Sequence, residues 1–175
     1  RVAGGQGDFP AASRYFEESL SIFRSIGARQ YIAPVIENLG VLAELQDDYD
    51  GANHYFEESL AMAQSIGNRQ GEAATLCWLG NVASKQGEYA RALDLYHDAL
   101  ALARSIEAFP IMMDVLTGLS GILPDKLQAV QLLSLVINHH VSIEATRQEA
   151  ASKLDQLKAE LPEKEVDAAL KKGKN

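Results

Sequence analysis

The stretch Tyr15-Phe16-Glu17-Glu18-Ser19-Leu20 returns 40 residues later as Tyr55-Phe56-Glu57-Glu58-Ser59-Leu60. Ser25-Ile26-Gly27 returns with the same shift as Ser65-Ile66-Gly67. A third copy keeps the period with less identity, in Tyr89, Ala92, Tyr96, Leu100, Ala103, Ser105 and Ile106. Whole strings that recur at a fixed period indicate a repeat architecture, in which each unit is one supersecondary element.

Each unit contains two helical patterns. Apolar and small residues step by three and four, the spacing of one helix face, in Ala52, Phe56, Ser59, Leu60, Ala63 and Ile66. A preceding helix has Leu39-Gly40 in one unit and Leu79-Gly80 in the next. Glycine inside a helix costs about 1 kcal/mol relative to alanine, so its return predicts a place where a neighbouring helix comes close. Short polar turns, such as Gln86-Gly87-Glu88, join the two helices into an antiparallel hairpin.

The spacing Ile36-x2-Leu39-Gly40-x2-Ala43, followed by Ala52-x3-Phe56, resembles the tetratricopeptide-repeat family pattern Trp-x2-Leu-Gly-x2-Tyr and Ala-x3-Phe. Leu76-x2-Leu79-Gly80-x2-Ala83 with Ala92-x3-Tyr96 matches it again. The chain departs from the family in lacking the Trp, the Tyr and the closing Pro, and its unit of 40 residues resembles a long-repeat subclass of regulatory scaffolds. The resemblance implies an all-α, right-handed superhelical solenoid of antiparallel helix hairpins.

The repeats are expected over residues 1–141, and a C-terminal capping helix pair over 142–175. A helix opening at Phe109-Pro110 is predicted to reach about Leu123. In the cap, Ala150, Leu154, Leu157 and Leu161 describe one amphipathic helix, and Pro162 starts a shorter one that ends at Gly173. The closing region is also similar to that of large bacterial ATPase-type transcriptional regulators, which would place ATP and DNA binding elsewhere.

The start of the chain predicts a truncated first hairpin. Arg1-Val2-Ala3 aligns with Asn81-Val82-Ala83, the end of a first-type helix, so we expect a fragment of a longer protein. The apolar stripe of the helix over 9–26 would then lack the preceding helix of its hairpin and be exposed. Three coverings are expected: a second copy by self-association, lattice contacts, or upstream residues.

Composition limits the partners. The 16 basic and 24 acidic residues give 16 − 24 = −8, which disfavours binding to nucleic acid or to an anionic membrane surface. No stretch approaches the roughly 20 apolar residues that a membrane-spanning helix needs. Cys77 is the single cysteine, so no internal disulfide forms and a cytoplasmic location is favoured.

The sequence predicts no enzyme, no metal site and no cofactor. Ala3-Gly4-Gly5-Gln6-Gly7 lacks the Gly-Lys-Ser/Thr of a phosphate loop and aligns with a turn. His54 and His97 lack a second ligand at helical spacing, and the neighbours His139 and His140 would point in different directions on a helix, so surface or helix-end positions are favoured. Cys77 has no neighbouring His in sequence and is interpreted as a plain thiol.

The predicted function is therefore binding, without catalysis. In such solenoids the first helix of each hairpin lines a concave face, to which the resemblance assigns Glu37, Asn38, Val41, Glu44, Leu45, Cys77, Trp78, Asn81, Ser84, Lys85, Asp114, Thr117 and Gly121. The partner-binding candidates among them are Glu37, Asn38, Glu44, Trp78, Asn81 and Lys85. Trp78, which replaces Asn38 of the preceding unit, is either an exposed binding anchor or packed on the next helix. The predicted partner is a protein or peptide segment; the alternative is a small effector sensed for an attached ATPase.

Overall fold

The computed structural model describes residues 8–174 and forms them into nine α-helices. These are α1 (Phe9–Ser25), α2 (Arg29–Glu44), α3 (Tyr49–Ser65), α4 (Arg69–Lys85), α5 (Tyr89–Ser105), α6 (Phe109–Ser120), α7 (Lys126–Asn138), α8 (Glu144–Glu160) and α9 (Glu163–Lys172). Successive hairpins begin 40 residues apart, at Arg29, Arg69 and Phe109, which confirms the all-α repeat fold. The predicted helix end at Arg1-Val2-Ala3 lies outside the described residues.

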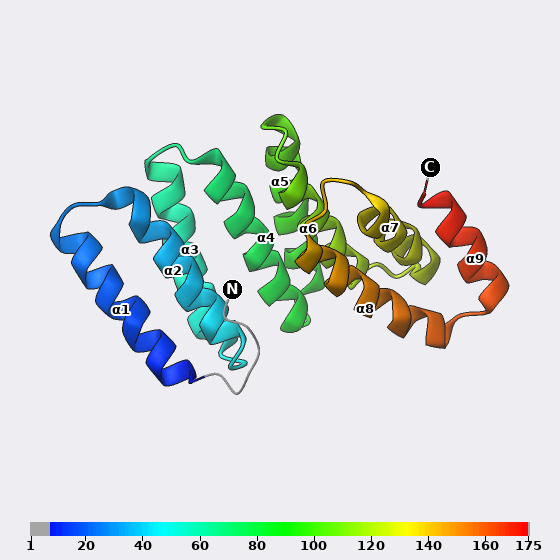
Figure 1. Ribbon diagram of the computed structural model, residues 1–175, viewed down its shortest axis with the longest axis horizontal. Helices are drawn as coiled ribbons and strands as arrows, with labels where there is room; N and C mark the ends of the chain where they lie inside the picture. Colours follow the sequence, from blue (N-terminus) through cyan, green and yellow to red (C-terminus); the bar gives the residue numbers. More distant parts are fainter. Residues whose placement is uncertain (1–7, 175) are drawn as a thin grey trace.

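The helices form two rows along a curved body (Figure 1). The inner row consists of α2, α4, α6 and α8, each packed on the next, and the outer row consists of α1, α3, α5 and α7. Both α3 and α5 contact the inner helix before them and the inner helix after them, and α9 packs on α7. α1 and α9 lie at opposite ends of the curved solenoid (Figure 1).

Local sequence sets the helix ends. Asp48 Oδ1 accepts a hydrogen bond from the Gly51 amide at 3.0 Å, so a short polar side chain caps α3. After α1 and α3 the chain turns through a left-handed residue, which is Gly27 (φ 67°) and Gly67 (φ 68°). The third repeat puts Glu107 (φ 54°) in that place. The turns therefore repeat in geometry even where the residue type changes.

Glycine sets how closely the two rows approach. A Cβ built at Gly40 would lie 2.6 Å from Cε1 of Phe56, and one at Gly80 would lie 2.7 Å from Cδ1 of Tyr96. The two rings are 0% and 1% exposed. The close helix contact predicted for the repeated glycines is therefore confirmed, and it explains why a residue that weakens the helix returns at this position.

The third hairpin is shorter than its predecessors, and α6 ends at Ser120, before the predicted Leu123. Two donors outside the α-helical ladder compete for the Thr117 carbonyl oxygen: Ser120 Oγ at 2.7 Å and Lys153 Nζ of α8 at 3.0 Å. The Gly121 amide bonds three residues back, to the Gly118 carbonyl. The last turn tightens and the helix stops.

The C-terminal pair forms as expected. α8 and α9 bury Leu154 and Val166 in one cluster with Val130 and Leu133 of α7. Most of their other residues are exposed, and α9 carries acidic residues in its first turn and lysines in its last, which complements the helix dipole. The pair therefore presents an apolar side to the repeats and a charged side to solvent.

Candidate functional site

The inner row lines an open groove of about 620 Å³. Equivalent positions of successive repeats line it, at 38, 41, 44 and 45 of each unit: Asn38, Trp78 and Gly118; Val41, Asn81 and Gly121; Glu44 and Ser84; Leu45 and Lys85. The 40-residue period thus brings together most of the concave-face residues predicted from the sequence.

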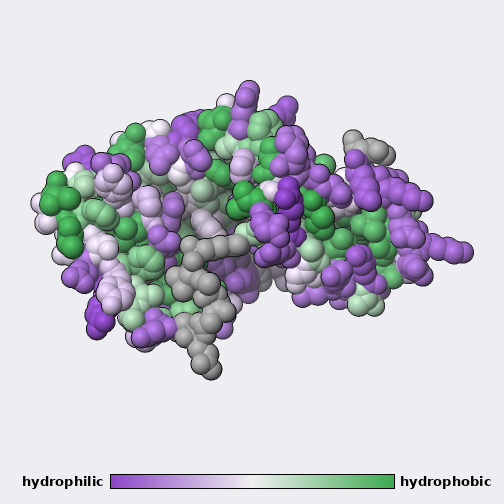
Figure 2. Space-filling model, in the orientation of Figure 1, coloured by the Kyte–Doolittle hydropathy of each residue, from purple (hydrophilic) through white to green (hydrophobic). Residues whose placement is uncertain are grey.

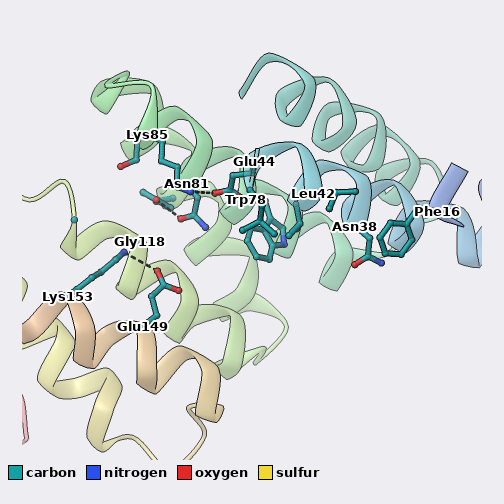
Figure 3. A pocket seen from close by; sticks show the side chains of 15 residues that line it. Phe16, Asn38, Leu42, Glu44, Trp78, Asn81, Lys85, Gly118, Glu149 and Lys153 are labelled. Atoms are coloured by element: carbon teal, nitrogen blue, oxygen red, sulfur yellow. Dashed lines mark hydrogen bonds and ion pairs between the residues drawn. The ribbon is translucent and has the colours of Figure 1, made fainter. Parts of the chain in front are cut away.

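Further residues, outside the predicted concave-face set, complete the groove. Phe16 of α1 lies at one end beside Asn38, and Glu149 and Lys153 of α8 stand at the other (Figure 3). Tyr96 and Leu42 also line it. The α8 wall exists because the cap folds back over α6, an arrangement that depends on tertiary packing. We call this whole surface the groove.

Trp78 is packed and also faces the groove. Its ring stacks on Phe56, with centroids 5.9 Å apart and an interplanar angle of 9°. The side chain remains partly exposed and lines the groove. One face of the ring is therefore fixed by Phe56 of the preceding helix α3, while the rest of the side chain stays accessible. The stack holds the indole in one orientation, which lowers the entropy lost when a ligand binds.

Tyr96 orients Asn81. The Tyr96 hydroxyl donates to Asn81 Oδ1 at 2.7 Å, and the amide nitrogen of Asn81 points into the groove (Figure 3). Burial raises the pKa of the Tyr96 hydroxyl, so it stays protonated and remains a donor. The substitution of tyrosine for the phenylalanine of the preceding repeat was the available signal for this contact.

An ion pair lies across two repeats of the groove. Lys85 Nζ is 2.9 Å from Glu44 Oε1, and the Glu44 side chain is 9% exposed against 48% for Lys85. Burial alone would lower the pKa of Lys85, but the hydrogen bond and charge of Glu44 outweigh it and raise the pKa. At the far wall Lys153 pairs with Glu149 at 3.2 Å. The groove therefore holds two cations, each beside a carboxylate.

Two kinds of reactive group, a metal-binding cluster and an ionised thiol, are not found among the described residues. These residues contain no group of three or more His, Cys, Asp or Glu that could hold a metal ion. Burial, followed by the negative charge of Asp114, raises the pKa of the Cys77 thiol, so it is protonated at neutral pH. Within the same described part, no helix combines the length and apolar character needed to cross a bilayer.

The comparison with known families agrees with this geometry. The family model for the tetratricopeptide repeat matches residues 1–65 and, overlapping them, 31–105. The chain belongs to the tetratricopeptide repeat family. No curated protein matches the chain. Tetratricopeptide repeats generally mediate protein–protein interaction, and the family is typically a non-catalytic scaffold.

Three predicted concave-face residues lie elsewhere in these tetratricopeptide repeats, and all share position 37 of the unit. Glu37 accepts hydrogen bonds from Ser59 at 3.1 Å and from Thr75 at 2.8 Å, between α2, α3 and α4. Its equivalents Cys77 and Thr117 are 5% and 1% exposed. Successive side chains of an α-helix are rotated by about 100° around the helix axis. Position 37 therefore faces the next repeat, while position 38 faces the groove.

Asp114 is also absent from the groove lining. Its carboxylate accepts a hydrogen bond from Thr146 Oγ1 of α8 at 2.5 Å, so it helps to hold the cap on the third tetratricopeptide repeat. The assignment of Glu37, Cys77, Asp114 and Thr117 to the concave surface is therefore corrected. Asn38, Glu44, Trp78, Asn81 and Lys85 lie together in the groove.

Proposed function

We propose that this chain binds a peptide segment of another protein in the groove, with Trp78 as the anchor. The observation that carries the proposal is the stack of Trp78 on Phe56, which presents a fixed, partly exposed indole in a concave site. Aromatic residues held in this way are common centres of binding energy. Family membership supports a protein partner in general, and the groove supports this location.

Two amides give the groove a complement to a peptide backbone. Asn38 donates one amide N–H to the Pro34 carbonyl at 2.8 Å, so its carbonyl oxygen and its second N–H can bond to a partner. The carbonyl oxygen of Asn81 accepts the hydrogen bond from Tyr96, so Asn81 offers its amide nitrogen to a partner. One acceptor and one donor on neighbouring repeats suit the N–H and C=O groups of an extended chain.

The charges of the groove favour a partner segment of low net charge. Glu44 and Lys85 neutralise each other, as do Glu149 and Lys153. A strongly charged segment would have to break one pair and leave a half-buried charge without its partner. We therefore expect binding that changes little between low and physiological salt.

The chain reports on its own groove, because Trp78 is its single tryptophan. We expect saturable changes in tryptophan emission on titration with peptides of low net charge, and loss of binding, read by anisotropy of labelled peptide, in Trp78→Ala. Tyr89→Ala is the matched control, because Tyr89 is 57% exposed and outside the groove. Equal binding by both variants would remove Trp78 from the site.

A second candidate function is the sensing of a small effector. The groove volume falls within the roughly 300–1,000 Å³ of small-molecule sites, and α8 walls one side of it. This function predicts that compounds of drug size shift the Trp78 emission while peptides of eight or more residues do not. Peptide binding without small-molecule binding would exclude it.

We also propose that the protein works in the cytoplasm as part of a larger bacterial regulator, with residues 1–141 as the binding module and 142–175 as its cap. The similarity of the closing region, from Ala129-Val130-Gln131-Leu132-Leu133 to Gly173, supports this context. Sequencing the coding region around residue 1 tests it: a nucleotide-binding or DNA-binding motif in the same reading frame is expected, and a stop codon directly upstream would contradict it.

A further inference from the structure

α1 exposes a face that its counterparts bury. Positions 12, 16, 19 and 23 of α1 are Ala12, Phe16, Ser19 and Phe23, and all four are partly exposed. Their equivalents in α3 and α5 are 0–1% exposed: Ala52, Phe56, Ser59 and Ala63, then Ala92, Tyr96, Ala99 and Ala103. At positions 12, 16 and 19 the residue types are similar while the exposure differs, so burial there follows from the neighbouring helices.

Larger apolar side chains widen this face. Tyr15 is 62% exposed and Ile22 is 51% exposed. Their equivalents Tyr55 and Met62 are partly buried and pack on the apolar cluster of the preceding repeat, which includes Leu20 and Ile36. Figure 2 shows hydrophobic surface at the α1–α2 end of the molecule and a mostly hydrophilic surface over α8 and α9. We call Ala12, Tyr15, Phe16, Ser19, Ile22 and Phe23 the α1 face.

The chain itself shows what covers such a face. Phe56 of α3 lies between Gly40 of α2 and Trp78 of α4. Tyr96 of α5 lies between Gly80 of α4 and Gly118 of α6. Both α3 and α5 are thus held between two inner helices, and the inner helix that precedes each of them brings glycine against its aromatic ring. Among the described helices, α1 packs extensively on α2 alone.

We propose that the α1 face is a docking site for a helix of the inner-row type. The occupant is an amphipathic helix that carries Gly-x2-Ala on its contact side, runs antiparallel to α1 and places its glycine against Phe16. This surface continues an interface that the chain already builds twice, with Gly40-x2-Ala43 against Phe56 and Gly80-x2-Ala83 against Tyr96. The α1 face adjoins the groove at Phe16, which belongs to both surfaces, and its other residues lie outside the groove lining.

The glycine gives the proposal a sharp test. The probe is a fluorescein-labelled peptide of residues 69–86, which contains Leu79-Gly80-x2-Ala83, titrated into the full chain under reducing conditions and followed by anisotropy. The matched control is the same peptide with Gly80→Ala. Alanine raises helix propensity, so propensity alone predicts tighter binding by the control. Docking predicts the opposite, at least about tenfold weaker binding, because the added methyl meets the Phe16 ring.

Variants of the chain locate the binding. Ile22→Glu changes an exposed residue of the α1 face and is expected to abolish binding of the peptide, whereas Trp78→Ala, in the groove, is expected to leave it unchanged. No saturable binding, equal affinity of the Gly and Ala peptides, or loss of binding only in Trp78→Ala would each overturn the proposal. A dimer of the chain that Ile22→Glu dissociates and that the peptide does not displace would also overturn it, by making a second copy the occupant.

Discussion

Gly80 of α4 faces the Tyr96 ring so closely that a Cβ at Gly80 would lie 2.7 Å from the ring atoms Cδ1 and Cε1. Gly80→Ala therefore sets two effects against each other. Alanine favours the helix by about 1 kcal/mol, but a buried ring must move, and overpacking of this kind costs about 1–3 kcal/mol. We expect a net loss of stability, measured as a lower urea midpoint. Gly121→Ala is the control, since its nearest atom would be 3.4 Å away, and it should be neutral.

Glu37 makes stability depend on pH. Burial raises the pKa of its carboxyl, and the hydrogen bonds from Thr75 and Ser59 offset part of that rise. The folded state thus holds this proton more tightly than the unfolded state, and stability falls as pH rises from the ordinary glutamate value, 4.5, through the raised pKa.

Glu37→Gln should remove this fall, because the side-chain oxygen can still accept both hydrogen bonds while no charge is buried. Thr75→Val should steepen it, since one bond that favours the carboxylate is lost. Urea unfolding across this pH range measures both slopes. Parallel curves for the wild type and the two variants would show that Glu37 does not carry the dependence.

Glu107 occupies a left-handed backbone position (φ 54°) that is glycine in the two preceding repeats. A side chain costs roughly 1–2 kcal/mol in this conformation, so Glu107→Gly should stabilise the protein by about 1 kcal/mol after the entropy of glycine is included. The reverse change, Gly67→Ala, meets nothing within 4 Å and should destabilise through backbone strain alone. Opposite shifts of the thermal midpoint are expected; a destabilised Glu107→Gly would contradict this account.

Tyr96→Phe separates the ring from the hydroxyl. The variant keeps the packing on Gly80 and removes the hydrogen bond to Asn81, at a cost of about 1 kcal/mol in stability. We also expect weaker groove binding in the peptide titration, because the Asn81 amide loses its fixed orientation. Unchanged affinity together with lower stability would limit Tyr96 to a structural role.

The local features of this fold could be predicted from residues alone. The 40-residue period, the glycines at close helix contacts and the polar turns between helices depend on neighbours one turn or one hairpin away, so sequence spacing records them. The end of α6 could not be predicted in this way, because Lys153 of the distant α8 bonds to the Thr117 carbonyl.

Some features of the groove could likewise be predicted from the sequence, and others depend on tertiary packing. The period determined that positions 38, 41, 44 and 45 would recur on one side of the inner row, and Asn38, Trp78 and Lys85 lie there. Helix packing decided which side of the inner helices faces the groove, and it placed Glu37 and Cys77 in the interface between repeats. It also decided the α8 wall of Glu149 and Lys153 and the hold of Tyr96 on Asn81. Such contacts join residues from different helices, and only the folded chain fixes their distances.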